Sequence, residues 1–203
     1  MFFKRLTVGP LGTNCYLAGD KDNLLVIDPG ADAGEIIKEI EKSGCTARYI
    51  VLTHCHIDHY GAAKEIKEKT KSLVLISEKE KDNYLNDAIT LSSYFGSSKG
   101  KPAPDMLLKE GEKIVSGEYE FKVIETPGHT SGGICLLCGN ILFSGDTLFY
   151  ESIGRTDFPT GDFDVLLKNV REKIFTLPPE TEVYPGHGGK TTVGHEMENN
   201  TFF

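Results

Sequence analysis

The chain has 203 residues, 39% of them hydrophobic and 26% charged, which is the balance of a soluble globular protein with one sizeable core. Its net charge of −8 comes from acidic residues spread along the chain, and the lysines at 64–71 alternate with glutamates on a solvated face, so nucleic acid is not an expected partner. No apolar run reaches the roughly 18 residues of a membrane helix, and the N-terminus lacks the order of a signal peptide. Five cysteines without framework spacing fit a reducing compartment. We therefore expect one cytoplasmic domain over 1–203 with no membrane partner, and the composition leaves the oligomeric state unknown.

Short apolar strands alternate with helices in the first half of the chain. The helix predicted at 33–42 has Ile36, Ile37 and Ile40 at helical spacing, and Gly44 follows its end. This alternation predicts an α/β architecture, with strands at 23–28, 48–53 and 72–77 and a second helix at 61–70.

Residues 82–105 interrupt this alternation. Gly, Ser, Pro and Lys surround the apolar segment 88–95, which predicts a short helix within a long surface excursion. Excursions of this length are often lids or binding loops. Leu91, Tyr94 and Phe95 could therefore cover a substrate, although simple packing on the body of the protein is an equal alternative.

The second half begins near Asp105 and repeats the mixture of strands and helices. A turn at 138–140 joins two of its strands, and the last strand leads into a glycine-rich segment at 185–189. Two αβ layers packed sheet against sheet would account for both halves. The predicted elements are strands at 118–125, 133–137, 140–144 and 182–184 and a helix at 163–175.

The strongest chemical signal is THCHIDH at 53–59, between an apolar strand and a helix. Alternate residues of an extended chain point the same way, so His54 and His56 can share one metal ion. Asp58 and His59 lie where the chain turns into the helix and can reach a second ion. Imidazole and carboxylate are ligands typical of zinc, iron and manganese.

Three further segments place a candidate ligand among small residues after a strand. They are TPGHT at 126–130, FSGDT at 143–147 and YPGHG at 184–188. Five of the six histidines fall in these motifs or in 53–59, and His195 is expected to be an ordinary surface residue. Cys135 and Cys138 are interpreted as packing residues, and the side chain of Cys55 should point away from the ligands.

These motifs resemble the metallo-β-lactamase superfamily, whose hallmark is the H-x-H-x-D-H loop, and the likeness runs from Asp28 to His187. Within that superfamily the chain is most similar to glyoxalase II (hydroxyacylglutathione hydrolase). Because it ends at Phe203, we expect the short form without the C-terminal helical domain. The specific marks are SGDTLF at 144–149, SIGRTDFPTG at 152–161 and PGHGGKTTVG at 185–194.

The resemblance implies an αββα sandwich of two mixed β-sheets flanked by helices, with two divalent metal ions at one edge. Zinc is the first expectation, with iron or manganese as alternatives. One ion would be held by His54, His56 and His129, the other by Asp58, His59 and His187, with Asp146 bridging both.

The implied reaction is hydrolysis of a small-molecule acyl thioester by a metal-bridging hydroxide. Asp58 would be the catalytic residue that orients the hydroxide or takes up its proton. Arg155 matches a basic position of the family and could bind a substrate carboxylate, or it could pair with Asp157 or Asp162. Asp28 is a candidate hydrogen-bond partner of a ligand histidine or, alternatively, a cap of its own turn.

Other reactions of the same fold are alternatives to the thioester hydrolase. A persulfide dioxygenase uses a single iron and would not need His59 or His187 as ligands. A lactonase or β-lactamase also shares the fold, but lactamases with a zinc-bound cysteine carry that cysteine where Asp146 stands. A metal-stabilised module without catalysis would use a closed, cysteine-rich site.

Overall fold

Strands that are buried on both faces build the first sheet. In β3 (Leu24–Ile27), Leu25 and Ile27 face one side of the sheet and Leu24 and Val26 the other, and all four are buried. Such continuous apolar strands are typical of parallel sheets covered on both sides. In the computed structural model, which describes residues 1–95 and 100–203, the order of this sheet is β1-β2-β3-β4-β5-β6. Its other strands are β1 (Phe2–Val8), β2 (Thr13–Gly19), β4 (Ala47–Leu52), β5 (Leu73–Ser77) and β6 (Met106–Leu108).

The second sheet is also mixed and has the order β14-β13-β10-β9-β8-β7 in the described part of the chain. Strand β10 pairs in parallel with β13 and antiparallel with β9. A short hairpin of β11 (Leu148–Phe149) and β12 (Ser152–Ile153) lies beside it. The sheet consists of β7 (Lys113–Ser116), β8 (Tyr119–Glu125), β9 (Ile134–Cys138), β10 (Ile141–Gly145), β13 (Glu182–Pro185) and β14 (Thr191–Thr192).

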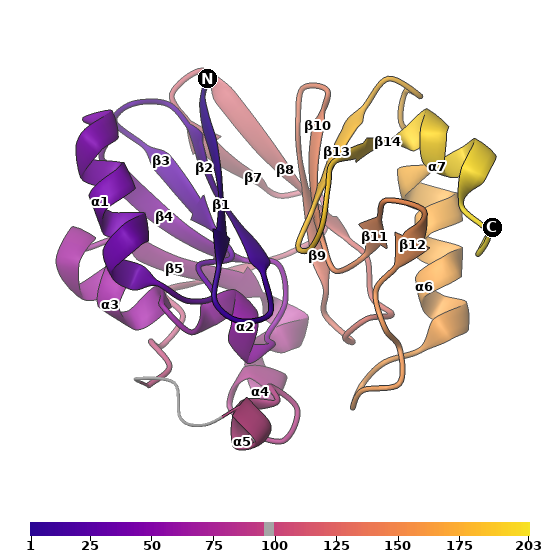
Figure 1. Ribbon diagram of the computed structural model, residues 1–203, viewed down its shortest axis with the longest axis horizontal. Helices are drawn as coiled ribbons and strands as arrows, with labels where there is room; N and C mark the ends of the chain where they lie inside the picture. Colours follow the sequence, from indigo (N-terminus) through magenta and orange to yellow (C-terminus); the bar gives the residue numbers. More distant parts are fainter. Residues whose placement is uncertain (96–99) are drawn as a thin grey trace.

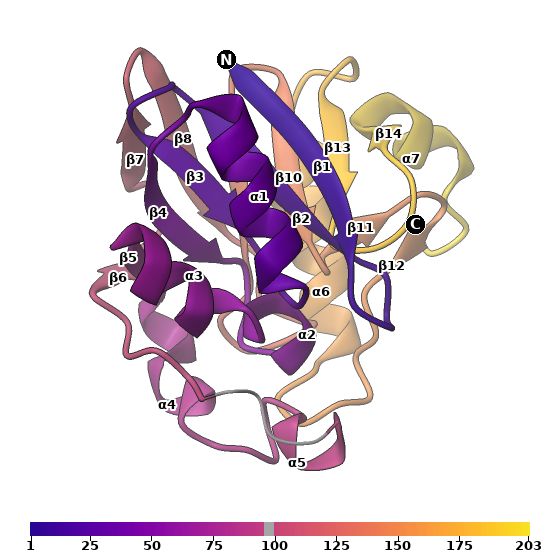
Figure 2. The same ribbon diagram turned by 60° about the vertical axis from the view of Figure 1, so that its left-hand side comes forward.

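The two sheets face each other, and helices cover their outer sides (Figure 1). Helices α1 (Ala33–Ser43) and α3 (Ala63–Thr70) pack on the first sheet, in front of it in Figure 2, and α6 (Phe163–Asn169) and α7 (Val193–Asn199) pack on the second. A π-helical turn at Val170–Ile174 continues α6. The remaining short helices are α2 (Ile57–Tyr60), a 3₁₀ turn at Glu78–Glu80, α4 (Lys81–Tyr84) and α5 (Ser92–Phe95).

Three apolar layers hold this arrangement together. The central one lies between the sheets and contains the rings of Tyr16, Phe121 and Phe143, each buried. Two outer layers join each sheet to its helices. This confirms the predicted αββα sandwich of two mixed sheets flanked by helices.

The structure corrects the predicted course of the chain at its start. Residues before 23 were not assigned to any element, yet β1 and β2 form a long antiparallel hairpin there. The residues of β2 are buried throughout, and its Thr, Asn and Gly break the alternation of apolar and polar residues that is typical of a strand. This is why the sequence did not predict a strand there. Of the excursion predicted at 82–105, residues 96–99 lie outside the described residues.

In the described ranges, none of the helices has the length and apolar character that crossing a bilayer requires. The cytoplasmic location and the lack of a nucleic-acid or membrane partner stay predictions.

Candidate metal centre

The candidate ligands follow the carboxyl ends of strands that run in the same direction within each sheet. In the first sheet, segment 53–59 follows β4, which is parallel to β3. In the second sheet, β8, β10 and β13 share one direction, and the segments with His129, Asp146 and His187 follow their ends. The backbone joins the two sheets here, since the N–H of Ile134 donates to the carbonyl of Thr53 at 2.9 Å. The parallel strand directions therefore bring all seven side chains to one edge of the sandwich.

Three buried imidazoles form the first group. His56 Nδ1 lies 3.0 Å from His54 Nε2 and 2.9 Å from His129 Nε2, so the three nitrogens point at a common centre. The alternation of His54 and His56 along the extended chain is the one expected from the sequence. This is the group that the resemblance assigns to the first ion.

Asp58, His59 and His187 form the second group, and Asp146 lies between the two groups. His187 Nε2 is 3.2 Å from Asp58 Oδ2, and His59 Nε2 is 3.5 Å from the same oxygen. Asp146 directs Oδ1 at His59 (3.5 Å) and Oδ2 at both His129 (3.5 Å) and His187 (3.6 Å). A carboxylate in this position can bridge two ions.

Hydrogen bonds to neighbouring groups fix which ring nitrogen of His54 and of His129 is free to bind a metal ion. Thr53 Oγ1 donates to Asp28 Oδ2 at 2.7 Å, so it accepts from His54 Nδ1 at 3.1 Å and leaves Nε2 as the ligand atom. His129 Nδ1 donates to the backbone carbonyl of Arg155 at 2.6 Å, with the same result. The rings of His54 and His129 are thus held in the tautomer that metal binding requires.

Asp28 is a buried partner of the centre and does not merely cap its turn. Its Oδ1 accepts from the backbone N–H of Thr53 at 2.8 Å, and its Oδ2 lies 3.0 Å from His59 Nδ1. Asp28 has a φ of 52°, in the left-handed region that aspartate tolerates better than most residues. Of the two interpretations of Asp28, the structure supports a direct partner of a ligand histidine, because its carboxylate lies in ion-pair contact with His59.

The donor set fits bound metal ions. His59 Nε2 and Asp146 Oδ1 are buried and lack a hydrogen-bond partner among the described residues, which is costly unless something else binds there. The space is also kept clear, because a Cβ at Gly186 would collide with Asp146 Oδ1 and lie 2.8 Å from His59 Cε1. Nitrogen and oxygen ligands of this kind suit zinc, iron or manganese.

The charges of the metal-free centre are divided between its two groups. Burial lowers the pKa of His56 to about 3, with help from the His129 ring. Burial also disfavours the charged form of His59, but Asp58 and Asp146 outweigh it and raise its pKa to about 10. His56 is therefore ready to bind a cation, whereas His59 holds a proton that a cation must displace.

We expect metal binding to release protons and to strengthen as the pH rises. At neutral pH, below its raised pKa, His59 is protonated in the metal-free protein, and it must lose that proton to become a ligand. Calorimetric titration with zinc in buffers of different ionisation enthalpy should show buffer-dependent heats and about two ions per chain. His195→Gln is the control, because His195 pairs with Glu151 outside the centre. Buffer-independent heats would contradict the assignment of His59, and a firm ratio of one ion would favour single-metal chemistry.

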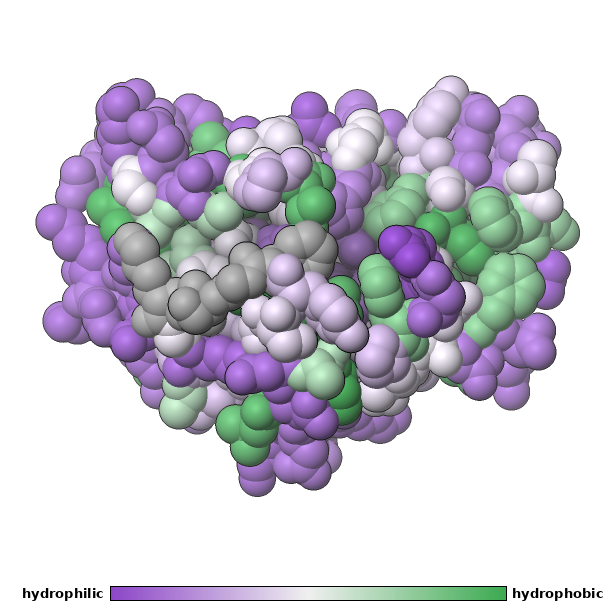
Figure 3. All heavy atoms as spheres, turned by 60° about the horizontal axis from the view of Figure 1, so that its bottom comes forward, coloured by the Kyte–Doolittle hydropathy of each residue, from purple (hydrophilic) through white to green (hydrophobic). Residues whose placement is uncertain are grey.

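Five of the seven candidate ligands line a cleft of about 240 Å³. Figure 3 shows hydrophobic residues near the middle of the molecular face that it views, with a mainly hydrophilic margin on its left. Leu11, Leu91, Phe149, Arg155 and Phe158 line the cleft around the ligands. A substrate that reaches the metal edge therefore meets mostly apolar walls.

The residues predicted to contact substrate differ in whether they line the cleft. Arg155 reaches the cleft, but it donates to Asp157 at 2.9 and 2.7 Å and lies over the ring of Phe158, as in the salt-bridge alternative. Leu91 lines the cleft, whereas Tyr94 is 78% exposed and does not. Phe95 ends α5, and its side chain lies outside what the structure describes. Substrate binding by Arg155 stays a prediction.

Some residues around the centre were not predicted from the sequence. Phe149 and Phe158 lie within two of the motifs quoted for the resemblance, so their positions were a usable signal. Thr13, whose hydroxyl donates to Asp58 Oδ2 at 3.0 Å, and Leu11 come from the unassigned hairpin, and only the fold brings them to the site.

Comparison with known proteins places these features in a family. The family model described as "Metallo-beta-lactamase superfamily" matches residues 8–187. The probable metallo-hydrolase YqgX of Bacillus subtilis (strain 168) is 37% identical, over 100% of this chain and 97% of its own. Hydroxyacylglutathione hydrolase GloC of Haemophilus influenzae is 34% identical, over 93% of this chain and 92% of its own.

Solved structures agree with the fold. BLEG-1 B3 metallo-beta-lactamase superposes with a TM-score of 0.89 at 36% identity, covering 99% of each chain. TTHA1623, solved in a di-iron-bound form, has a TM-score of 0.90 at 33% identity and covers 98% of this chain and 100% of its own. ETHE1 from Myxococcus xanthus has a TM-score of 0.82 at 29% identity, over 99% of this chain and 84% of its own.

Proposed function

Because this chain belongs to the metallo-β-lactamase superfamily, we propose that it hydrolyses small-molecule acyl thioesters with the help of two divalent metal ions, zinc being the first expectation. The activity would resemble that of hydroxyacylglutathione hydrolases, and the similarity to GloC supports it. The similarity to a di-iron structure keeps iron among the candidate metals.

The observation that carries the proposal is that five of the seven candidate ligands are open to the cleft. His56, Asp58, His129, Asp146 and His187 all line its floor. Structural metal sites are closed and usually tetrahedral with cysteine ligands, whereas catalytic sites keep a position open for substrate. An open site favours catalysis over a stabilising role.

The composition of the cleft favours a good leaving group. Among the described residues that line it, Arg155 is the one titratable side chain besides the expected ligands. An amine or alkoxide leaves poorly without a proton donor, whereas a thiolate needs little help because its parent thiol has a pKa of about 8.5. Thioesters therefore fit this cleft better than lactams or lactones.

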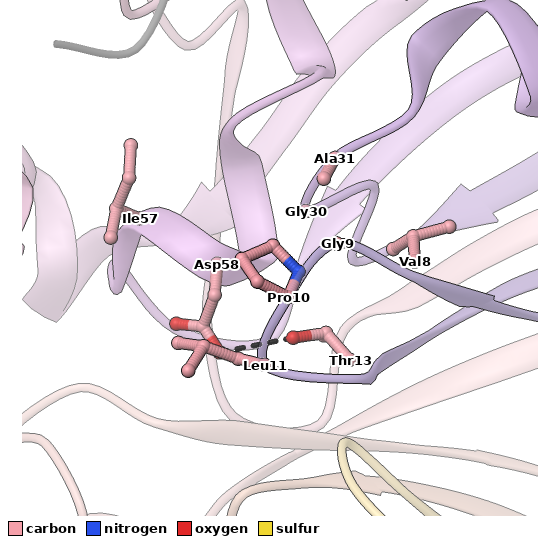
Figure 4. Close-up of a pocket in the computed structure, with 9 residues that line it drawn as sticks. All are labelled: Val8, Gly9, Pro10, Leu11, Thr13, Gly30, Ala31, Ile57 and Asp58. Atoms are coloured by element: carbon pink, nitrogen blue, oxygen red, sulfur yellow. Dashed lines mark hydrogen bonds between the residues drawn. The ribbon is translucent and has the colours of Figure 1, made fainter. Parts of the chain in front are cut away.

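The protein's own part in the reaction centres on Asp58. Thr13, His59 and His187 all approach its Oδ2, and Figure 4 shows its other oxygen pointing away from Thr13. That oxygen can orient a nucleophilic water or take up its proton. When bound, two metal ions would supply a hydroxide at neutral pH and polarise the acyl carbonyl.

We expect the metal-loaded protein to hydrolyse thioesters with little dependence on the thiol. The guanidinium of Arg155 is already paired with Asp157, so a glutathione carboxylate gains little there. Thioesters of glutathione and of small thiols with the same acyl group should differ in kcat/KM by less than about tenfold, or about 1.4 kcal/mol. A larger advantage for glutathione would show that the chain recognises this thiol.

The same assay separates the alternatives within the fold. A lactam, a lactone and a persulfide substrate should each be turned over far more slowly than the best thioester. Faster lactam hydrolysis would favour an activity like that of BLEG-1, and oxygen consumption with a persulfide would favour the dioxygenase. Either outcome would overturn the thioester proposal.

A further inference from the structure

The structure has a second, apolar pocket, whose lining residues are drawn in Figure 4. It has a volume of about 170 Å³, and its apolar walls are formed mainly by Val8, Pro10, Leu11, Ala31 and Ile57. Leu11 and Asp58 line both this pocket and the cleft, so the two spaces are neighbours at the metal edge. We refer to it below as the hairpin pocket, since the turn of the β1–β2 hairpin forms one side of it.

Leu11 separates the hairpin pocket from the cleft. It lies in the turn 9–12, where the N–H of Gly12 donates to the carbonyl of Gly9 at 3.2 Å and the N–H of Gly9 donates to Asp32 at 2.8 Å. The backbone of the turn is thus held in place. The side chain of Leu11 is nevertheless 45% exposed, which leaves it free to change rotamer.

The hairpin pocket suits an alkyl group and not a polar one. Thr13 and Asp58 are its polar side chains, and they are hydrogen-bonded to each other. Because most of the lining is aliphatic, a polar occupant would lose most of its bonds to water without replacement. A cavity of about 150 Å³ lined by aliphatic and aromatic residues binds benzene, so this pocket accommodates roughly four to six carbon atoms.

Its size and position also decide which part of a thioester could enter it. Thiol carriers such as glutathione are polar and much too large for this volume. Asp58, at the boundary, is beside the place where the acyl carbon reacts in the proposed function. The acyl chain is the part of the substrate that both fits the pocket and starts next to it.

We propose that the hairpin pocket is an acyl-chain subsite, and that the protein prefers thioesters of unbranched medium-length aliphatic acids to acetyl thioesters. This rests on the proposed thioester hydrolysis. The carbonyl group lies at the metal edge, and the chain passes Leu11 towards Ala31. Ile57, between the ligands His56 and Asp58, forms part of the wall, so the subsite and the ligands share one segment of backbone.

The test compares acetyl, butanoyl, hexanoyl and octanoyl thioesters of one small thiol. Burial of each methylene should raise kcat/KM about three- to fourfold as far as hexanoyl, with little further gain at octanoyl. Ala31→Leu fills the pocket and should lower the ratio of hexanoyl to acetyl kcat/KM by about tenfold. Leu11→Ala removes the partition and should shift the optimum to longer or branched chains. Leu85→Ala, at a leucine that is 73% exposed and lines neither space, is the control and should keep the wild-type ratio.

A binding measurement keeps the proposal independent of turnover. Hexanoate should bind the metal-loaded protein more tightly than acetate, with methyl NMR shifts at Leu11, Ala31 and Ile57, and Ala31→Leu should remove that advantage. If hexanoate behaves so while no thioester is hydrolysed, the subsite stands and the proposed function fails.

Three results would overturn the subsite while leaving thioester hydrolysis intact. They are equal kcat/KM for all acyl chains, a preference that Ala31→Leu does not change, and a chain-length dependence that follows the alkyl group of the thiol in place of the acyl group.

Discussion

Replacement of Asp58 by alanine is expected to lower kcat/KM for a thioester by about 10²–10⁴-fold while the protein stays folded. Asp58 contributes to both the second ligand group and the edge of the cleft, and its Oδ2 already holds Thr13 and His187. It belongs to none of the three apolar layers, so its loss removes chemistry and not the core. Rates, circular dichroism and metal content should be measured on the same preparation.

Two comparisons define what the loss means. Asp22→Ala, at an exposed aspartate that lines neither the cleft nor the hairpin pocket, should keep wild-type rates. Asp58→Asn keeps the shape but not the charge, and should also be strongly impaired. Near-normal turnover in a folded Asp58→Ala protein would remove Asp58 from its assigned role.

Replacement of Asp28 by alanine is expected to affect both stability and metal binding. Asp28 is 1% exposed and holds Thr53 through its N–H and hydroxyl as well as the charged ring of His59. Removing one partner of such a buried pair typically costs about 3–5 kcal/mol of unfolding free energy. Loss of an outer partner also weakens metal binding by about 10–100-fold. Denaturant unfolding and metal titration would measure the two effects.

Asp32→Ala provides a matched control for Asp28. Asp32 also has a left-handed backbone, with a φ of 54° compared with 52° for Asp28. Alanine tolerates this conformation less well than aspartate, so the backbone cost of the replacement is similar at both positions. Asp32 is exposed, and among the described residues its side chain accepts one hydrogen bond, from the N–H of Gly9. If the two variants unfold alike, the buried contacts of Asp28 contribute nothing measurable.

The sequence predicted those strands whose apolar character is continuous. The segments 23–28, 48–53 and 72–77 become β3, β4 and β5, and the helix at 163–175 becomes α6 with its π-helical turn. Strand β2 was missed because burial between two neighbours, and not its own residues, makes it a strand. The β-propensity of a residue is a weak guide where tertiary packing decides whether a segment forms a strand.

The candidate ligands could be identified because each lies in a short motif of its own. Their surroundings could not, since they come from distant parts of the chain. Thr13 reaches Asp58 across 45 residues, and the carbonyl of Arg155 reaches His129 across 26. The pairing of Arg155 with Asp157 was one of two open alternatives, and its geometry required the folded loop.

The division of the ligands between the two sheets has a consequence for biosynthesis. His54, His56, Asp58 and His59 emerge from the ribosome with the first sheet, but each ligand triad also needs a residue from the second, either His129 or His187. Chains fold from the N-terminus as they are made. A nascent chain that stops before His129 can therefore assemble neither complete triad. Acquisition of two ions would then be a late event that follows the docking of the two halves.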